Sequence, residues 1–269
     1  MMSNETKASI FVGVLAAVLA SGFLWWKSQK APASAEVVAP GPVTTPVLPG
    51  AAPQAEAAAI AAIRHPFDTA PPAAPLPALD DSDRPLTEAL VGLLGEKPWQ
   101  ALFYPDRIVR RIVATIDNLP RQDAPVNMWP VKPVGAWMMT AGAGDALHMA
   151  PDNARRYAAY AALVKAVNAA LLVDIYRRFY PLFQQAYVEL GYPQGYFNDR
   201  LVAAIDDLLA APELAEPPRL VQRKVIYQFA DPDLERRSAG QKILLRIGAD
   251  HARIVKARLR EIRSMVARP

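Results

Sequence analysis

The pattern of apolar and polar positions divides the chain into three parts. Residues 8–26 (ASIFVGVLAAVLASGFLWW) form a run of 19 residues without a charged side chain. Residues 31–79 contain 11 prolines, many alanines and only four charged residues, so they cannot bury enough apolar surface to offset the entropy of ordering. From about residue 80 onward, apolar residues recur at intervals of three and four, which predicts a helical domain.

Within that domain, the apolar stripes predict a series of amphipathic helices. They cover residues 85–94, 105–119, 151–190, 198–211, 239–247 and 250–267, with one helical turn after Asp231. Residues 134–149, in which two apolar runs flank AGAGD, predict a β-hairpin, and residues 219–229 predict a short extended segment. Pro181 lies inside the longest helix and predicts a kink there. The fold class is therefore mainly α: one compact helical domain with at most a small β-hairpin.

Polar residues at the expected helix starts support these boundaries. Ser82 or Asp83 can cap the first helix, and Asn198 can cap the helix that follows the glycine at 191. Asp231 precedes a proline, in the order that favours a helix start. Ser238–Gln241 matches the capping-box pattern.

The uncharged run at residues 8–26 fits a transmembrane helix. At about 1.5 Å rise per residue it spans about 29 Å, close to the hydrocarbon core of a bilayer. Lys7 and Lys27 flank it, and Trp25–Trp26 lie where interfacial aromatic residues are expected. A cleaved signal peptide is the alternative, because Ala33–Ala35 resembles a cleavage site. We favour the uncleaved anchor, because Lys27 precedes that site and the run is long for a signal peptide.

The expected organisation is a short tail (1–7), a transmembrane helix (8–26), a Pro/Ala-rich disordered tether (27–79) and a helical domain (80–269). Positive charges on the two sides of the span nearly balance, so they do not decide the orientation. A short N-terminal tail stays easily in the cytoplasm, and long domains cross largely regardless of charge. We therefore favour a domain outside the cytoplasm, while the opposite orientation stays open.

Composition excludes some chemistry and locates the basic charge. The chain has no cysteine, which excludes disulfides and thiolate chemistry. The formal net charge is +4, but residues 236–269 contain 10 basic and 2 acidic side chains. Any electrostatic partner is therefore expected at the last helices.

An aromatic cluster is the first candidate site. Eight of the 22 aromatic residues fall within residues 176–197, interleaved with amides. Aromatic faces beside amides and a carboxylate suit a glycan or peptide groove. The candidate ligand-binding residues are Tyr180, Gln184, Tyr187, Tyr192, Tyr196, Asn198, Asp199 and Arg200. The alternative is that the phenylalanines belong to the core and the tyrosines lie at its rim.

The last helix is the second candidate. Its basic face, opposite an apolar face, consists of Arg253, Lys256, Arg260 and Arg263. Such a stripe can bind anionic headgroups or nucleic acid, and the alternative is a solvated surface. Arg258 falls outside this pattern and is expected near the apolar side, where it can pair with a carboxylate.

Catalytic, metal and cofactor motifs give no comparable signal. Glu189 and Asp199 flank a glycine-containing loop and are the only plausible pair for a two-carboxylate glycosidase. His65, His148 and His251 share no metal-ligand spacing, and His65 is expected to be solvated in the tether. We predict no metal, no cofactor and no assigned catalytic residue.

Three strings carry a family resemblance. DNLPR (117–121), YPLFQQAYVELGYPQGYFNDRLV (180–202) and KVIYQFADPDLERRSAGQKILLRIG (224–248) together resemble the bacterial family known as domain of unknown function 3014. The resemblance covers roughly residue 79 to the C-terminus and includes the layout of anchor and tether. It implies an envelope protein of proteobacteria without an assigned activity. We therefore expect a single-pass protein of the bacterial inner membrane with a periplasmic domain.

The function expected from these observations is that of a non-enzymatic interaction module in the cell envelope. Its partners would be the membrane, through residues 8–26, and an unidentified envelope protein or glycan. One alternative is an envelope glycan hydrolase that uses Glu189 and Asp199. Another is a cytoplasmic polyanion binder that uses the basic face, which requires the opposite orientation. Nucleic acid is the less favoured partner.

Overall fold

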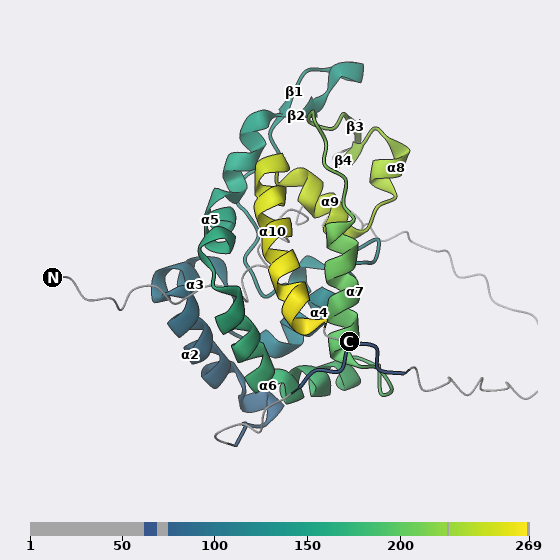
Figure 1. The fold of residues 1–269 in the computed structure, drawn as a ribbon. Helices are drawn as coiled ribbons and strands as arrows, with labels where there is room; N and C mark the ends of the chain where they lie inside the picture. Colours follow the sequence, from purple (N-terminus) through teal and green to yellow (C-terminus); the bar gives the residue numbers. More distant parts are fainter. Residues whose placement is uncertain (1–61, 69–74, 225, 268–269) are drawn as a thin grey trace, which may run out of the picture.

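The computed structural model describes residues 62–68, 75–224 and 226–267, and these residues form a mainly α-helical domain (Figure 1). Its helices are α2 (Asp83–Leu94), α3 (Glu96–Leu102), α4 (Ile108–Asn118), α5 (Ala158–Ala166), α6 (Ala169–Glu189), α7 (Phe197–Leu209), α8 (Pro232–Glu235), α9 (Ala239–Arg246) and α10 (Ala249–Val266). The strands are β1 (Thr140–Ala141), β2 (His148–Met149), β3 (Leu220–Arg223) and β4 (Ile226–Phe229). Short 3-10 turns include η1 (Leu79–Asp81) and η4 (Pro151–Tyr157).

The main core is organised around α10. In Figure 1 this helix runs between α5 and α7, and it also packs against α6 and α9. Helix α4 lies against α6 and α7, and α2 covers α4 and α6. The apolar stripes point inward: Leu86, Leu90, Ile108 and Leu259 are 0% exposed. Burying each such side chain contributes about 1.5–3 kcal/mol, so the stripes hold the bundle together.

Two hairpins form one end of the domain. β1 pairs antiparallel with β2, with Thr140 opposite Met149, and β3 pairs with β4, with Leu220 opposite Phe229. The Leu220 N–H donates to the Leu147 carbonyl at 2.8 Å and joins the hairpins. A second, smaller core lies there, formed by Met149, Leu220, Phe229, Leu234 and Leu245. The mainly α fold with a minor antiparallel sheet is therefore confirmed, and residues 219–229 form a hairpin rather than a single extended segment.

The prediction of one continuous helix over residues 151–190 is wrong in two respects. Residues 151–157 form the 3-10 helix η4, and α5 begins at Ala158. The helical region then breaks at Val167–Asn168, where the two halves bend by 84°. The Asn168 side chain accepts the N–H groups of Ala170 and Leu171 at 3.0 and 3.2 Å, so it caps α6. Pro181 lies inside α6 without ending it, as predicted.

Several predicted caps have other roles. The Ser82 hydroxyl donates to the Leu79 carbonyl at 2.6 Å and does not cap α2. The Asp83 carboxylate instead accepts the N–H groups of Arg107 and Ile108 at 2.6 and 2.8 Å. It therefore caps α4, which begins at Ile108 and not at the proline at 105. Helix α3 was not predicted.

The two downstream caps are confirmed. Asp231 accepts the Asp233 N–H at 2.8 Å and starts α8. Ser238 accepts the Gln241 N–H at 3.1 Å and starts α9, but the Gln241 side chain bonds the Asp207 carbonyl at 2.9 Å and does not complete the box. Gly248 (φ 91°) separates α9 from α10.

The predicted anchor at residues 8–26 and most of the tether lie outside the described residues, so those predictions stay predictions. Among the residues that the structure does describe, no single helix combines the length and apolar character that a membrane crossing requires. The bent pair 151–166 and 169–189 meets both criteria only when its two helices are taken together.

Candidate peptide-binding site

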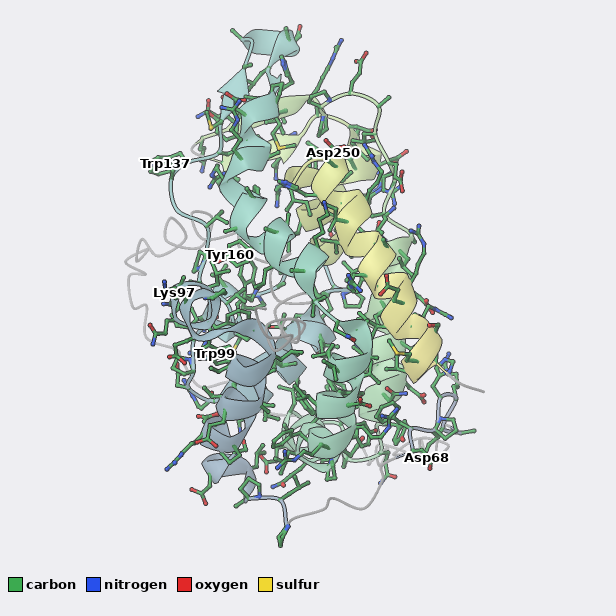
Figure 2. All side chains as sticks on the ribbon, turned by 60° about the vertical axis from the view of Figure 1, so that its left-hand side comes forward. Asp68, Lys97, Trp99, Trp137, Tyr160 and Asp250 are labelled. Atoms are coloured by element: carbon green, nitrogen blue, oxygen red, sulfur yellow. The ribbon has the colours of Figure 1, made fainter. Side chains whose placement is uncertain are left out.

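Residues 62–68, which we call the docked segment, lie against the helical domain. In Figure 1 their dark blue trace passes the C-terminal end of α10, and in Figure 2 Asp68 lies beyond that end, far from Trp137. The segment is irregular, with a bend at Arg64–His65. Its Phe67 packs against the main core. This part of the predicted tether is therefore ordered on the domain, and His65 is half-buried rather than solvated.

Four hydrogen bonds hold the backbone of the docked segment. The N–H groups of Arg64 and His65 donate to the two oxygens of Asp199 at 3.0 and 2.8 Å. The Asn198 amide donates to the His65 carbonyl at 2.9 Å, and the Phe67 N–H donates to the Tyr196 hydroxyl at 2.8 Å. A carboxylate that accepts two consecutive amides forms charge-assisted bonds, which are about twice as strong as neutral ones. The domain thus recognises this segment through its main chain.

Phe67 is the side-chain anchor of the docked segment. Its ring centroid lies 4.9 Å from that of Tyr176 and 5.4 Å from that of Tyr180, with tilted planes. The Arg177 guanidinium carbon lies 5.5 Å from the Phe67 centroid. Tilted aromatic pairs contribute about 0.5–1.5 kcal/mol beyond area burial, and an arginine over the ring adds to this. One turn of α6 therefore forms a receptor for an aromatic side chain.

The first turn of α7 positions the polar groups. Asn198 is 0% exposed, accepts the Tyr176 hydroxyl at 3.2 Å and donates to the Val266 carbonyl at 2.8 Å. Its predicted role as a helix cap is wrong, because the side chain joins the docked segment to the end of α10. Asp199 lies in the first helical turn, where the helix dipole stabilises a carboxylate.

Gln184 supports the site from α6. Its amide donates to the Gly195 carbonyl at 2.8 Å, and its carbonyl oxygen accepts the Phe197 N–H at 2.8 Å and the Tyr180 hydroxyl at 3.2 Å. A Cβ at Gly195 would lie 2.7 Å from the Tyr187 ring, so glycine lets this loop approach α6. Gln184 thereby fixes the entry into α7.

Behind this turn lies a buried carboxylate, Asp117 at the end of α4. It accepts Arg200 Nε at 2.9 Å, the Arg121 guanidinium at 2.8 Å and the Tyr192 hydroxyl at 3.1 Å. Burial acts to lower the pKa of Arg121, but the charges and hydrogen bonds of Asp117 and Tyr192 together outweigh it, so the pKa is raised. The Gly240 N–H donates to the carbonyl of residue 119 at 2.9 Å, so all three strings of the family resemblance meet here.

The two tyrosines under the docked segment keep their hydroxyl protons to a higher pH than a free tyrosine does. Desolvation raises the pKa of Tyr176 and of Tyr180, and the neighbouring Tyr196 adds to both shifts. Uncharged hydroxyls serve here as hydrogen-bond donors, since Tyr176 donates to Asn198 and Tyr180 to Gln184.

The eight residues predicted for this site separate into two groups. Tyr180, Tyr196, Asn198 and Asp199 contact the docked segment. The other four stabilise the loop and the end of α4, namely Gln184, Tyr187, Tyr192 and Arg200. Of the four tyrosines, Tyr180 and Tyr187 are buried, at 5% and 6% exposed, whereas Tyr192 and Tyr196 are half-buried. Ligand binding by these residues stays a prediction.

Sequence reasoning missed Tyr176, Arg177 and the docked segment itself. Residues 62–68 lie between Ala- and Pro-rich stretches, so composition hides them. The one local signal is that Ile63 and Phe67 are large apolar residues in a segment that otherwise contains few.

The basic face of α10 needs a correction at Lys256. This side chain is buried, and its ammonium group donates to the Ala211 carbonyl at 2.5 Å, in the stretch of chain just after α7. Arg253 pairs with Asp250 at 2.5 Å, and Arg263 pairs with Asp206. Arg260 is exposed. Arg258 pairs with Glu261 and also donates to the carbonyl of residue 165 at 3.2 Å. The predicted stripe is therefore interrupted and partly neutralised.

The two carboxylates of the hydrolase hypothesis have separate partners. Glu189 accepts Arg110 at 2.9 Å and the Gln185 amide at 3.0 Å, whereas Asp199 accepts the docked segment. Within the part of the chain that the structure describes, no group of three or more His, Asp or Glu side chains could hold a metal ion. The arrangement therefore suits binding better than acid–base chemistry.

Comparison of the chain with known protein families gives a match that covers the helices of this site. A family model described as "Protein of unknown function (DUF3014)" matches residues 108–263, in agreement with the resemblance that the three strings carry. No curated protein and no solved structure matches the chain. The matched span includes the residues of α6 and α7 that contact the docked segment, and it does not include the segment itself.

Proposed function

We propose that this chain, which belongs to the DUF3014 family of proteins of unknown function, carries a non-enzymatic interaction module that binds short, non-helical peptide segments. The module would be held at the bacterial inner membrane by residues 8–26, with its domain in the periplasm. The observation that carries the proposal is the docked segment, whose backbone is bound by Asn198, Asp199 and Tyr196 while Phe67 contacts an aromatic pair.

The chemistry of these contacts favours a peptide over a glycan. A glycan groove presents open aromatic faces to sugar rings, whereas here Phe67 covers Tyr176 and Tyr180. The polar groups of the site match a peptide main chain, since a carboxylate meets two amides and an amide meets a carbonyl. In known peptide recognition, main-chain hydrogen bonds supply affinity and side-chain pockets supply specificity.

The two alternatives receive less support. For a hydrolase, Glu189 and Asp199 would have to leave their present partners. A polyanion binder would need an open basic face on α10. Lys256 of that face is buried, and Arg253 and Arg263 already pair with carboxylates.

A fluorescent peptide with the sequence of residues 62–68 (AIRHPFD) tests the proposal directly. The full chain in mild detergent would carry Phe67→Ala, which removes the internal anchor and vacates the site. We expect saturable binding by fluorescence polarisation to this variant and weaker binding to the wild type, where the internal segment competes.

A second substitution connects this binding to the site. Asp199→Asn, added to Phe67→Ala, should abolish binding. Asparagine has no charge, and its donor NH2 group would face one of the two backbone N–H groups that the carboxylate accepts. Asp250→Asn is the matched control, since that carboxylate is 85% exposed at the start of α10 and should leave binding unchanged. The proposal fails if the folded Phe67→Ala chain does not bind the peptide, or if Asp199→Asn has no more effect than Asp250→Asn.

The location has its own test. An alkaline phosphatase fused to the C-terminus of the full chain should be active in intact bacteria if the domain is periplasmic. An inactive fusion that is stably expressed would show that the domain lies in the cytoplasm, opposite to the proposed orientation.

A further inference from the structure

The side chain of His65 has a polar ring nitrogen that its surroundings in the site do not pair. Its backbone is bonded on both sides, by Asp199 at 2.8 Å and by Asn198 at 2.9 Å. Its ring nitrogen Nδ1 is buried, yet among the described residues it has no hydrogen-bond partner. A buried polar atom without a partner opposes binding, because it loses water and gains nothing in return.

Other side chains of the docked segment point to solvent. Arg64 and Asp68 are exposed, and Ile63 is 54% exposed. Specificity therefore rests on two positions: the aromatic anchor at 67, which fits well, and position 65, which does not.

Pro66 suits the site for a reason of its own. It has no N–H group to leave unpaired, and the N–H groups on either side of it, at His65 and Phe67, both donate to the domain. Proline also fixes its own φ and restricts the preceding residue, which lowers the entropy that binding must remove.

We infer that the docked segment is a resident ligand that a partner displaces, and that the partner is a peptide segment with an apolar residue, a proline and an aromatic residue in succession. The inference rests on the proposed function, because it names the ligand of the same site. An apolar side chain at position 65 keeps every backbone bond and removes the unpaired nitrogen. Such a ligand should bind about tenfold tighter than the resident sequence.

This preference decides whether displacement is feasible. A segment tethered next to its own site acts at an effective concentration of about 1 mM. A free ligand of equal affinity would have to reach that concentration, whereas one that binds about tenfold tighter displaces half of the segment at about 0.1 mM. The mismatch at His65 is thus what lets an outside partner compete.

Two peptides that differ at one position test the inference. AIRHPFD and a version with leucine in place of histidine are titrated into the full chain carrying Phe67→Ala. The leucine peptide should have an about tenfold lower Kd. A third peptide, with leucine but with alanine instead of phenylalanine, should not bind. Equal affinities of the first two peptides, or tighter binding of the histidine peptide, would overturn the inference and leave the proposed function standing. If neither of these two peptides binds, both the inference and the proposed function are overturned.

Displacement itself is read in the wild-type chain by amide hydrogen exchange. The N–H groups of Arg64, His65 and Phe67 should exchange faster when the leucine peptide is present at saturating concentration, because they lose their acceptors. Unchanged exchange at saturation would show that the peptide binds elsewhere. Conversely, His65→Leu in the chain should slow exchange at Arg64 and Phe67 by about tenfold, and a faster rate would also contradict the inference.

Discussion

Asp117→Asn tests whether the buried carboxylate at the end of α4 stabilises the domain as its contacts suggest. The side chain is 6% exposed, and it accepts Arg200, Arg121 and Tyr192. Asparagine has nearly the same shape but no charge, and one of its two terminal groups is a donor that would face an existing donor. The substitution therefore removes electrostatic pairing with little change in volume.

The magnitude follows from the exposure of each partner. The bond to Arg200, whose side chain is 23% exposed, counts as a bond to a charged group and contributes about 1.5–3 kcal/mol. Arg121 is 48% exposed, so screening by water reduces its pair to about 0.5 kcal/mol. The Tyr192 hydroxyl contributes about 1 kcal/mol, which the amide oxygen of asparagine retains in part. We expect a loss of about 3 kcal/mol in the free energy of unfolding, out of a total of about 5–15 kcal/mol for a domain.

Urea unfolding of the full chain in mild detergent, followed by circular dichroism, measures this loss. Asp123→Asn is the control, because that exposed carboxylate lies in the next loop and should change stability by less than about 0.5 kcal/mol. Arg200→Met combined with Asp117→Asn should cost less than the sum of the two single changes, since each removes the partner of the other. A loss below about 1 kcal/mol for Asp117→Asn, or strict additivity of the pair, would refute the reasoning.

Three further changes test other parts of the fold. Phe67→Ala should speed hydrogen exchange of the docked segment's amides. It should lower the free energy of unfolding by about 1–2 kcal/mol at most, because no more stability can be lost once the segment has detached. Ile63→Ala, at a side chain 54% exposed on the same segment, should have neither effect. Desolvation raises the pKa of Tyr180 above its usual 10.0, so the stability that its neutral hydroxyl contributes is complete below pH 10 and is lost as the pH rises beyond that value. The free energy of unfolding, measured in urea between pH 8 and about 11, should therefore decline, and it should decline less in Tyr180→Phe. Gly240→Ala should destabilise by about 1–3 kcal/mol in thermal unfolding, since a Cβ would lie 2.6 Å from a leucine methyl group of α7, whereas Gly92→Ala, where a Cβ meets nothing within 4 Å, should not.

The helical pattern predicted the fold well where one face of a helix meets one layer of core. The stripe along α6 is an example, because Leu172, Phe179, Phe183 and Ala186 are buried, although Leu171 and Leu190 of the same apolar pattern are 36% and 38% exposed. The same pattern gave no sign of the break at Val167–Asn168. Alanine-rich sequence fits a helix on either side of that point, and the 84° bend depends on where α5 and α6 pack in the tertiary structure.

The candidate site was predicted less well, for two physical reasons. A helical wheel gives the direction of a side chain but not what covers it, so Lys256 was placed on an exposed face although it is buried and bonded to the chain just after α7. The docked segment is separated by 129 to 135 residues from the groups that hold it, Tyr196, Asn198 and Asp199, and local pattern carries no information about so distant a contact.

Three consecutive residues at the start of α7 connect the buried carboxylate to the peptide-binding site. Asn198 bonds the docked segment and the end of α10, Asp199 bonds the segment alone, and Arg200 bonds Asp117 on α4. A helical turn held from α4, α6 and α10 cannot tilt without breaking buried hydrogen bonds, so the groups that face the peptide are fixed before it arrives. Binding of an outside ligand should therefore leave the helices in place and require only that residues 62–68 depart, which makes the affinity of that segment the quantity that sets the response of the module.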